Sequence, residues 1–285
     1  MLAMYYEHVD VFSKDPLKGN GLTVVFPEEM LPDDLLLSIA QELKQFETIF
    51  IFPQTEQGVF PCRIFTIEEE LPFAGHPVIG AGAVIHHRFF KEQQKQEISF
   101  DLSGRRIHLV SSKEDGSYCV VMNQGNPQFI DTIEEKDYLE ICEALCLNEE
   151  DLDPNYPLEV VSTGLPYLLI PVRRHIQDVR IKRHDFEDFI GKWRAKFAYI
   201  YETPTLECRS FDNQGAVEDI ATGSAAGPLI ASLVHNDKKA VNEKIQLYQG
   251  KFVGRPSVID GWVTEENEVV IQGHVAFFAS GRINI

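Results

Sequence analysis

An internal repeat constrains the fold of this chain more strongly than any other feature of its sequence. Residues 62–65 (CRIF) recur as residues 208–211 (CRSF), at an offset of 208 − 62 = 146 positions. Residues 74–81 correspond to residues 222–229, with a glycine in each segment at an offset of 223 − 75 = 148 positions. The two matches occur in the same order and at nearly the same offset, which predicts a duplicated chain.

A third pair of segments extends the repeat toward the N-terminus. Residues 19–25 correspond to residues 164–170, at an offset of 164 − 19 = 145 positions. A chain of 285 residues is also long enough for two hydrophobic cores. We therefore predict two homologous domains, at 1–118 and 119–285, which are joined within the polar region 113–128.

Hydropathy patterns predict related elements in both halves. Residues 76–90 and their counterpart 224–235 are apolar and rich in small residues almost all round, as expected of helices that are buried on every side. Apolar and β-branched stretches predict strands at 7–12, 23–26, 48–52 and 63–66, and apolar residues at helical spacing predict a further helix at 33–43. These patterns predict an α+β fold of two pseudo-symmetric domains, each a curled, mostly antiparallel β-sheet around a central buried helix.

Charge and composition exclude several classes of protein. With 26 basic and 44 acidic residues, a formal net charge of −18 and no dense cluster of Lys and Arg, the chain is not expected to bind nucleic acid. The N-terminus lacks the features of a signal peptide, and no apolar run approaches the length of a membrane span, so we expect a cytoplasmic protein with no membrane partner. The five cysteines are scattered, which favours buried free thiols over a zinc site.

Two glycine-containing helix starts occupy equivalent places in the two halves. Gly75 stands at the start of the first apolar helix and Gly223 at the start of the second. A helix N-terminus presents unpaired N–H groups and a partial positive charge, and glycine lets a ligand approach the backbone closely. Two such starts would grip a carboxylate or a developing enolate from both sides. Each motif alone is better explained by a tight turn that leads into a packed helix, but their symmetric placement, with His76 in one and Asp219 just before the other, favours a ligand site.

Three polar residues near these segments are candidates for chemistry. Glu47 lies between a helix and a strongly apolar strand, where desolvation suits a carboxyl group to proton transfer at neutral pH. The second half has Ala198 at the corresponding position, which favours a catalytic role for Glu47, because a catalytic carboxylate is needed only once. His76 alone is better explained as a core histidine that bonds to the backbone, and Asp219 alone can be explained as an acceptor of local N–H groups before a helix.

The chain resembles the phenazine-biosynthesis PhzF-like family in several motifs. Residues 70–77 (ELPFAGHP) and 218–228 (EDIATGSAAGP) resemble its two main motifs, while residues 10–12 with 19–20, and residues 162–167, resemble weaker ones. The resemblance covers essentially the whole chain, in order. It implies the diaminopimelate-epimerase-like fold, an active site between the two domains, a homodimer, and neither a metal nor an organic cofactor.

The resemblance also implies a role for each candidate residue. Glu47 corresponds to the family's proton-transferring glutamate. The residues that match its substrate-binding positions, as polar side chains or as backbone donors, are Gly75, His76, Asp219, Gly223 and Ser224. Related epimerases and racemases use a cysteine at each helix start. Neither start carries any of the five cysteines here, which disfavours a two-thiol racemase.

The chain departs from the family's pattern at three positions. Phe46 stands where the family has Ser before its glutamate, Ile220 replaces Pro in the second motif, and Glu69 replaces Gly in the first. We expect the changes at Ile220 and Glu69 to alter the local backbone only. Phe46 removes a hydroxyl group and adds bulk, so the phenazine precursor is not assumed to be the substrate.

Together, these features predict a cofactor-independent isomerase that acts on a small, cyclic carboxylic or amino acid. Glu47 would move a proton between carbons, and such general acid/base catalysis is typically worth about 10²- to 10⁴-fold in rate. Two alternatives stay open. The first is a non-catalytic protein that uses the same fold to bind a small acid or a partner, and the second is a racemase or epimerase with Glu47 and His76 as opposed bases.

Overall fold

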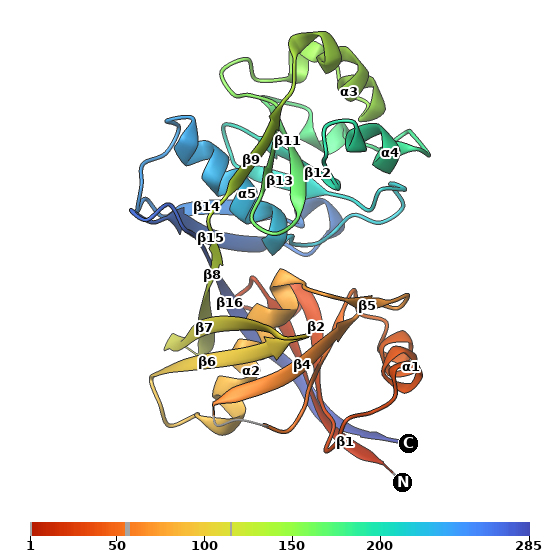
Figure 1. Cartoon of the computed structure of the whole chain (residues 1–285), viewed down its shortest axis with the longest axis vertical. Coiled ribbons are helices and arrows are strands. Elements are labelled where there is room, and N and C mark those ends of the chain that lie inside the picture. The colour runs from red at the N-terminus through yellow and green to blue at the C-terminus, as the bar shows by residue number, and fades with distance from the viewer. Residues whose placement is uncertain (1, 55–57, 115) are drawn as a thin grey trace. The chain divides into compact units, whose positions relative to one another are not determined.

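Figure 1 shows the computed structural model of the chain, which describes residues 2–54, 58–114 and 116–285. The chain forms two compact units. Unit 1 comprises residues 1–123 and 272–285, and unit 2 comprises residues 124–271. None of the helices formed by the described residues is long and apolar enough to cross a membrane.

Unit 1 is built on a closed β-barrel. The strand order is β1-β2-β3-β4-β6-β7-β8-β16, and β16 pairs in turn with β1. Most neighbouring strands in unit 1 are antiparallel, whereas β2 with β3 and β4 with β6 are parallel. The elements are β1 (Ala3–Val11), β2 (Asn20–Phe26), α1 (Asp33–Leu43), β3 (Thr48–Ile51), β4 (Val59–Phe65), β5 (Glu70–Leu71), α2 (Gly75–Phe89), β6 (Lys95–Leu102), β7 (Arg105–Glu114), β8 (Ser117–Gly125) and β16 (Val269–Asn284). Closure pairs the two edges of the sheet with each other.

Helix α2 packs against five strands of the barrel. It contacts β1, β2, β3, β6 and β7, and its residues from Gly75 to His86 are all buried. At Gly80 the helix lies especially close to β2. A Cβ atom at this position would lie 2.4 Å from Cδ2 of Leu22, which is too close, so glycine permits the contact. The small, apolar residues of this segment thus fit a helix that is enclosed on every side.

Unit 2 contains the other strands of the sheet, in the order β15-β14-β13-β12-β11-β10-β9. Strands β11 and β12 are parallel, as are β13 and β14, and α5 packs against β10, β11 and β15. The elements are β9 (Gln128–Thr132), α3 (Tyr138–Ala144), β10 (Glu159–Ser162), β11 (Pro166–Val172), α4 (Phe186–Gly191), β12 (Phe197–Glu202), β13 (Glu207–Ser210), α5 (Gly223–His235), β14 (Ile245–Gln249) and β15 (Ser257–Val263). Short 3₁₀ turns occupy some of the connections.

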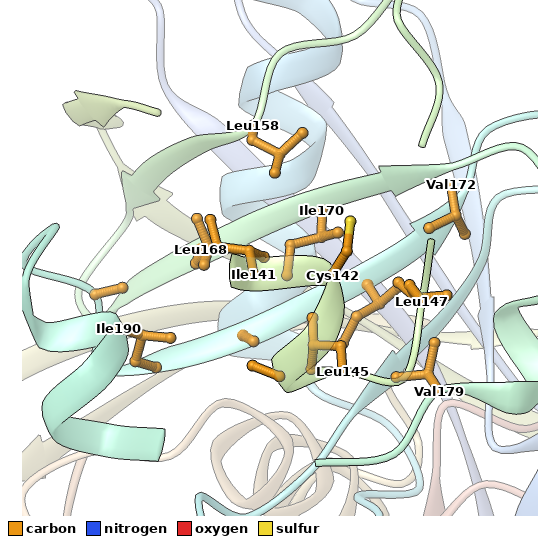
Figure 2. Close-up of a cluster of buried hydrophobic side chains, with 14 of the residues drawn as sticks. Ile141, Cys142, Leu145, Leu147, Leu158, Leu168, Ile170, Val172, Val179 and Ile190 are labelled. Atoms are coloured by element: carbon orange, nitrogen blue, oxygen red, sulfur yellow. The ribbon is translucent and has the colours of Figure 1, made fainter. Parts of the chain in front are cut away.

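A hydrophobic core fixes β11 within unit 2. Ile141 of α3 packs in one cluster with Leu168 and Ile170 of β11 and Ile190 of α4 (Figure 2). Burying each of these side chains contributes about 1.5–3 kcal/mol. Because successive side chains of a strand point to opposite faces, the same strand directs Tyr167 away from this cluster. The core therefore fixes the position of the strand on which Tyr167 lies.

The sheet-rich α+β fold predicted from the sequence is confirmed, and several of its elements lie where they were expected. The predicted helix at 33–43 coincides with α1. The predicted helices at 76–90 and 224–235 each begin one residue earlier, at Gly75 and Gly223. The four predicted strands of the first half overlap β1, β2, β3 and β4.

The compact units differ from the predicted segments at the C-terminus. Residues 272–285, which the sequence places in the segment 119–285, belong to unit 1 because β16 pairs with β1 along Ala3–Val11. The predicted domain boundary after residue 118 stays a prediction. It marks the end of a repeated sequence segment, which need not coincide with the boundary of a compact unit. Within the polar region 113–128, β7 ends at Glu114 and β8 begins at Ser117, and Asp115 lies outside the described residues.

Candidate active site

Glu47 lies where the chain passes from α1 into β3. Helix α1 ends at Leu43, and Lys44 adopts the left-handed backbone conformation (φ 54°) that often ends a helix. Strand β3 begins at Thr48, which pairs with both β2 and β4. This short connection leaves the side chain of Glu47 only 18% exposed, whereas the neighbouring Phe46 is 39% exposed.

His76 is the second residue of α2 and contacts Glu47. Its Nε2 atom lies 3.3 Å from Oε2 of Glu47, and its side chain is only 7% exposed. Pro77 follows it in the first turn of the helix, where a missing N–H costs nothing. Two of the predicted site residues, 76 − 47 = 29 positions apart, therefore meet inside unit 1.

The charge of His76 is set by its burial. Burial lowers the pKa of His76 to about 3, so the imidazole is uncharged at neutral pH. In a neutral imidazole one nitrogen donates a hydrogen bond and the other accepts one. His76 can therefore orient the carboxyl group of Glu47 or exchange a proton with it, and it adds no positive charge to the site.

The N-terminus of α2 contributes backbone donors at the same place. Its N-cap residue, Ala74, has no side chain that could cap the helix. The N–H groups of Gly75 and His76 belong to the first turn, where a helix supplies no acceptors of its own. The partial positive charge of this helix end favours negative charge that develops near the Glu47–His76 pair.

Asp219 organises the turn before α5 in unit 2. The hydroxyl group of Thr222 donates a hydrogen bond of 2.6 Å to Oδ2 of Asp219, and the N–H of Ala221 donates one of 3.4 Å to Oδ1. The backbone N–H of Asp219 donates to the carbonyl oxygen of Ser210 on β13. Asp219 is thus anchored in front of the helix start, in the manner expected of an Asp that accepts local donors.

Gln249, a residue that the sequence analysis did not identify, holds the same turn from β14. Its Nε2 atom donates to the carbonyl oxygen of Asp219 and to Oγ1 of Thr222, at 2.9 Å each. Its Oε1 atom accepts from the N–H of Thr222 at 3.1 Å and from the hydroxyl group of Tyr199 at 3.0 Å. Gln249 is 1% exposed, so these bonds form in a dry environment in which they are strong.

Two further contacts position the start of α5. Oγ of Ser224 and the hydroxyl oxygen of Tyr167 are 2.8 Å apart. Nε2 of Gln124 donates to the carbonyl oxygen of Gly223 at 3.0 Å, while Oε1 of Gln124 accepts from the hydroxyl group of Thr163 at 2.8 Å. Thr163 and Tyr167 belong to the weak motif at 162–167, which was noted as a motif without a role for either side chain.

The predicted site residues therefore form two groups. Unit 1 brings together Glu47, Gly75 and His76. Unit 2 brings together Asp219, Gly223 and Ser224. The cysteines lie elsewhere in each unit, and burial raises the pKa of Cys62 on β4 to about 12, which keeps it a protonated thiol.

Two other features of unit 1 could hold a ligand. Glu114, Cys119 and His274 have potential metal-ligand atoms within 4.8 Å of one another. Among the described residues, Glu47 and His76 have no third His, Cys, Asp or Glu close enough to form such a group with them. A cavity of about 550 Å³ lies at the far end of α2, where its lining includes Arg88 and Phe89. Neither Glu47 nor His76 lines this cavity.

Unit 1 thus combines a closed β-barrel with a carboxyl group and an imidazole that lie in contact at a helix start. The model of the phenazine biosynthesis-like (PhzC-PhzF) family matches residues 9–281. The chain therefore belongs to this family, and it is an isomerase.

Two relatives illustrate the similarity over the whole length. The chain is 30% identical to trans-2,3-dihydro-3-hydroxyanthranilate isomerase of Pseudomonas chlororaphis, over 98% of this chain and 99% of that protein. A solved structure from Pseudomonas aeruginosa, which bears the name of a predicted epimerase, superimposes with a TM-score of 0.91 at 39% identity and covers 99% of both chains.

The fold also extends to more distant enzymes. A hydroxyproline epimerase from Agrobacterium vitis has a TM-score of 0.60 and covers 99% of this chain and 94% of its own, at 9% sequence identity. At that identity the likeness concerns the fold alone. It agrees with an epimerase-like fold for this chain.

Proposed function

We propose that the protein is a cofactor-independent isomerase that moves a proton between two carbons of a small, cyclic carboxylic or amino acid, with Glu47 as general base and acid. The 3.3 Å contact between Glu47 and His76 carries this proposal. A largely buried carboxyl group, beside an uncharged imidazole and the positive end of a helix, is suited to take a proton from carbon.

In the proposed reaction, Glu47 takes a proton from one carbon of the substrate. The electron pair of that C–H bond enters the adjacent unsaturated system, and the N–H groups of Gly75 and His76 stabilise the negative charge that develops. Glu47 then gives the proton to another carbon and returns to its starting state. Substrate and product have the same composition and oxidation level, so the step requires no redox cofactor.

We assign the charged groups of the same substrate to Asp219, Gly223 and Ser224. Gly223 and Ser224 form the first turn of α5, a place where backbone donors favour an anion. The bonds to Tyr167 and from Gln124 support this assignment, because they fix the position of that turn. As a carboxylate, Asp219 would suit an amino group of the substrate.

The proposal includes two pseudo-symmetric domains with a central helix each. Strand pairing supports this part: Phe65 pairs with Glu70 in unit 1, and Phe211 pairs with Glu218 in unit 2. In each unit the helix begins five residues after the glutamate, since 75 − 70 = 5 and 223 − 218 = 5. Matched pairing followed by a matched helix start is expected of a duplicated fold.

The substrate class rests on the chemistry that the named relative performs. That protein is named for trans-2,3-dihydro-3-hydroxyanthranilate, a cyclic amino acid with a carboxylate. Phe46, beside Glu47, is 39% exposed, and an exposed aromatic side chain offers apolar surface for a substrate ring to pack against. We infer that this chain accepts a cyclic acid of related size whose ring packs against Phe46.

Two less specific parts of the proposal rest on the family resemblance alone. The first is a homodimer, for which light scattering would give twice the chain mass of 32.4 kDa. The second is a cytoplasmic location, which stays a prediction.

The distance between Glu47 and His76 counts against a two-base racemase. Two opposed bases must hold the reacting carbon between them, with each base about 3 Å or more from it. The Nε2 and Oε2 atoms are 3.3 Å apart, which leaves no room for a carbon atom between them. The same contact suits a single carboxyl group that acts with the help of its neighbour.

The experiment that tests the proposal measures exchange of carbon-bound hydrogen in deuterated water over a panel of cyclic amino and carboxylic acids that includes trans-2,3-dihydro-3-hydroxyanthranilate. We expect Glu47→Gln to remove nearly all exchange and turnover, because the amide keeps the shape of the side chain and loses the transferable proton. Ligand binding and folding should be largely retained.

The matched control is Glu97→Gln, which makes the same change at an exposed glutamate on β6 of the same unit. This variant should exchange hydrogen at the wild-type rate. A folded Glu47→Gln variant with wild-type turnover would refute the role of Glu47.

A further inference from the structure

Arg63 of unit 1 forms a two-pronged ion pair, called here fork 1, with Glu70. Its Nε atom donates to Oε1 of Glu70 at 2.7 Å, and its Nη2 atom donates to Oε2. The guanidinium carbon lies 5.0 Å from the centre of the Phe65 ring. A planar guanidinium that meets a carboxylate by two parallel bonds fixes direction as well as distance.

Arg209 of unit 2 forms the same arrangement with Glu218, called here fork 2. Its Nε atom donates to Oε1 at 2.9 Å and its Nη2 atom donates to Oε2 at 2.6 Å. The guanidinium carbon lies 4.7 Å from the centre of the Phe211 ring. Arginine, glutamate and aromatic ring thus recur in the same geometry, although the connection from Phe to Glu is two residues longer here (218 − 211 = 7 against 70 − 65 = 5).

Each fork holds the segment that leads directly into a candidate helix start. Glu70 is followed five residues later by Gly75 and then by His76. Glu218 is followed at once by Asp219, and five residues later by Gly223. In both units the backbone at the glutamate also pairs with the preceding phenylalanine, Phe65 in β4 and Phe211 directly after β13, so the segment is tied by side chain and main chain together.

Fork 1 also reaches the segment that leads to Glu47. Nη1 of Arg63 donates a bond of 2.8 Å to Oδ1 of Asp33, the first residue of α1. The far end of α1 is followed by the connection that contains Glu47. One guanidinium group therefore contacts the first residue of α1, the helix that precedes Glu47, and Glu70, which precedes His76.

The forks differ in how far they are exposed to water. The side chains of fork 2 are 3% and 9% exposed, whereas Arg63 and Glu70 are 17% and 33% exposed. Nη1 of Arg209 also donates to the carbonyl oxygens of Ile176, Gln177 and Val179, which leaves this cation fully engaged. Substitutions in fork 1 therefore disturb positioning with less risk to folding.

We propose that Arg63 with Glu70 and Arg209 with Glu218 are matched positioning pairs, which hold the helix starts of the two units in the geometry that the reaction needs. This inference rests on the proposed function for its catalytic part. Active sites lose about 100-fold in rate when a reacting group is displaced by about 1 Å. A lysine at position 63 keeps the charge and loses the two-pronged geometry, so the arginine itself is required.

The first arm of the test measures kcat and KM for Arg63→Lys, Glu70→Gln and the double variant. We expect kcat to fall about 10- to 100-fold with KM within about threefold of wild type. The double variant should lose little more than either single variant, because all three remove one interaction. Wild-type kcat in a folded Arg63→Lys variant would overturn the inference.

The matched control is Arg183→Lys. Arg183 makes the same two-pronged contact with Asp185, at 2.9 and 2.8 Å, but α4, which follows it, carries no candidate residue. This variant should keep wild-type kcat. A purely structural role for fork 1 would lower the melting temperature of Arg63→Lys without a specific fall in kcat, and that result would also overturn the inference.

The second arm needs no substrate. It records the ring ¹⁵N and ¹³C resonances of His76 at pH 7, assigned with His76→Asn, in wild type, Arg63→Lys and Arg183→Lys. Only Arg63→Lys should shift or broaden them, and unchanged resonances would overturn the inference whatever the kinetics. If these resonances move while Glu47→Gln proves fully active, the proposed function fails and the structural coupling stands.

Fork 2 is tested in the same way through the amide resonances of Gly223 and Ser224. Because Arg209 is buried and Arg209→Lys could fail to fold, Glu218→Gln is the second variant, since it keeps the shape of the side chain. Both amide resonances should shift in whichever variant folds. If they coincide with those of wild type, the matched role of fork 2 is refuted.

Discussion

The buried, neutral state of His76 makes the stability of the protein depend on pH in a defined direction. Its pKa is lowered from 6.5 to about 3 by burial, so in acid the unfolded chain takes up a proton that the folded chain refuses. The full stability is therefore present above about pH 6.5. It is lost as the pH falls from there toward 3, and this group causes no further loss below that pH.

The size of this effect follows from the two pKa values. One proton contributes about 1.4 kcal/mol of unfolding free energy per pH unit while only the unfolded state binds it. For pKa values of 6.5 and about 3, the loss between pH 7 and pH 4 is about 3 kcal/mol. That is a substantial part of the 5–15 kcal/mol that is typical of folded proteins.

The measurement compares wild type with His76→Gln by urea unfolding, followed by circular dichroism at half-unit steps from pH 7 to pH 4. Glutamine cannot take up the proton, so the unfolding free energy of the variant should fall about 3 kcal/mol less over this range. Circular dichroism is required because Trp193 and Trp262 both lie in unit 2 and do not report on unit 1.

The control is His108→Gln, which makes the same change at an exposed histidine on β7 of the same unit. Its loss of unfolding free energy between pH 7 and pH 4 should match that of wild type and exceed that of His76→Gln. A constant difference between wild type and His76→Gln from pH 7 to pH 4 would refute the burial of a neutral imidazole.

Three further predictions concern the candidate site. Gly75→Val and Gly223→Val should each weaken calorimetric binding of a substrate-like carboxylate, and non-additive losses in the double variant would indicate one shared ligand, whereas strictly additive losses would contradict it. Tyr167→Phe should cost about 1 kcal/mol of stability and raise KM, since Ser224 loses its partner; an unchanged KM would count against a binding role for Ser224. Replacement of all five cysteines by small residues should spare turnover, and loss of activity in a folded variant would restore a thiol mechanism.

Local features of the fold could be predicted from the sequence, whereas its long-range pairing could not. The limits of α1 follow from Pro32, from two acidic residues in its first turn and from apolar residues at helical spacing. The pairing of β16 with β1 joins the two ends of the chain. No pattern in residues 272–285 specifies that partner, because period-2 alternation indicates a strand but not its neighbour.

The same division applies to the candidate site. Glu47 and His76 were identified through motifs and an apolar context, and both lie in contact. Gln249 carries no local signal, since it acts on a turn about 30 positions away in sequence (249 − 219 = 30). Arg63 and Arg209 did carry a signal, because their segments define the repeat, but the repeat was interpreted only as a mark of duplication.

Strand register corrects one correspondence between the halves. The sequence comparison matched Glu47 with Ala198. Phe50 pairs with Arg63, and Ile200 pairs with Arg209, so the matching offset at this strand is 200 − 50 = 150 positions. Position 47 + 150 = 197 is a phenylalanine, so the second half still lacks a carboxylate there. The correspondence with Ala198 has an offset of 198 − 47 = 151 positions, one more than the strand register gives.

The two halves agree in their scaffold and differ in their reactive groups. Both retain the fork, its aromatic ring and the five-residue step to the helix. At the candidate site residues the two halves differ. By strand register, Glu47 corresponds to Phe197. His76 and Ser224 correspond because each directly follows the glycine that begins its helix. Under the proposed function, a duplicated scaffold would need only one proton-transferring pair, and a second would add a costly buried charge without a task. We therefore expect reactive groups to belong to unit 1, while unit 2 supplies substrate-holding groups.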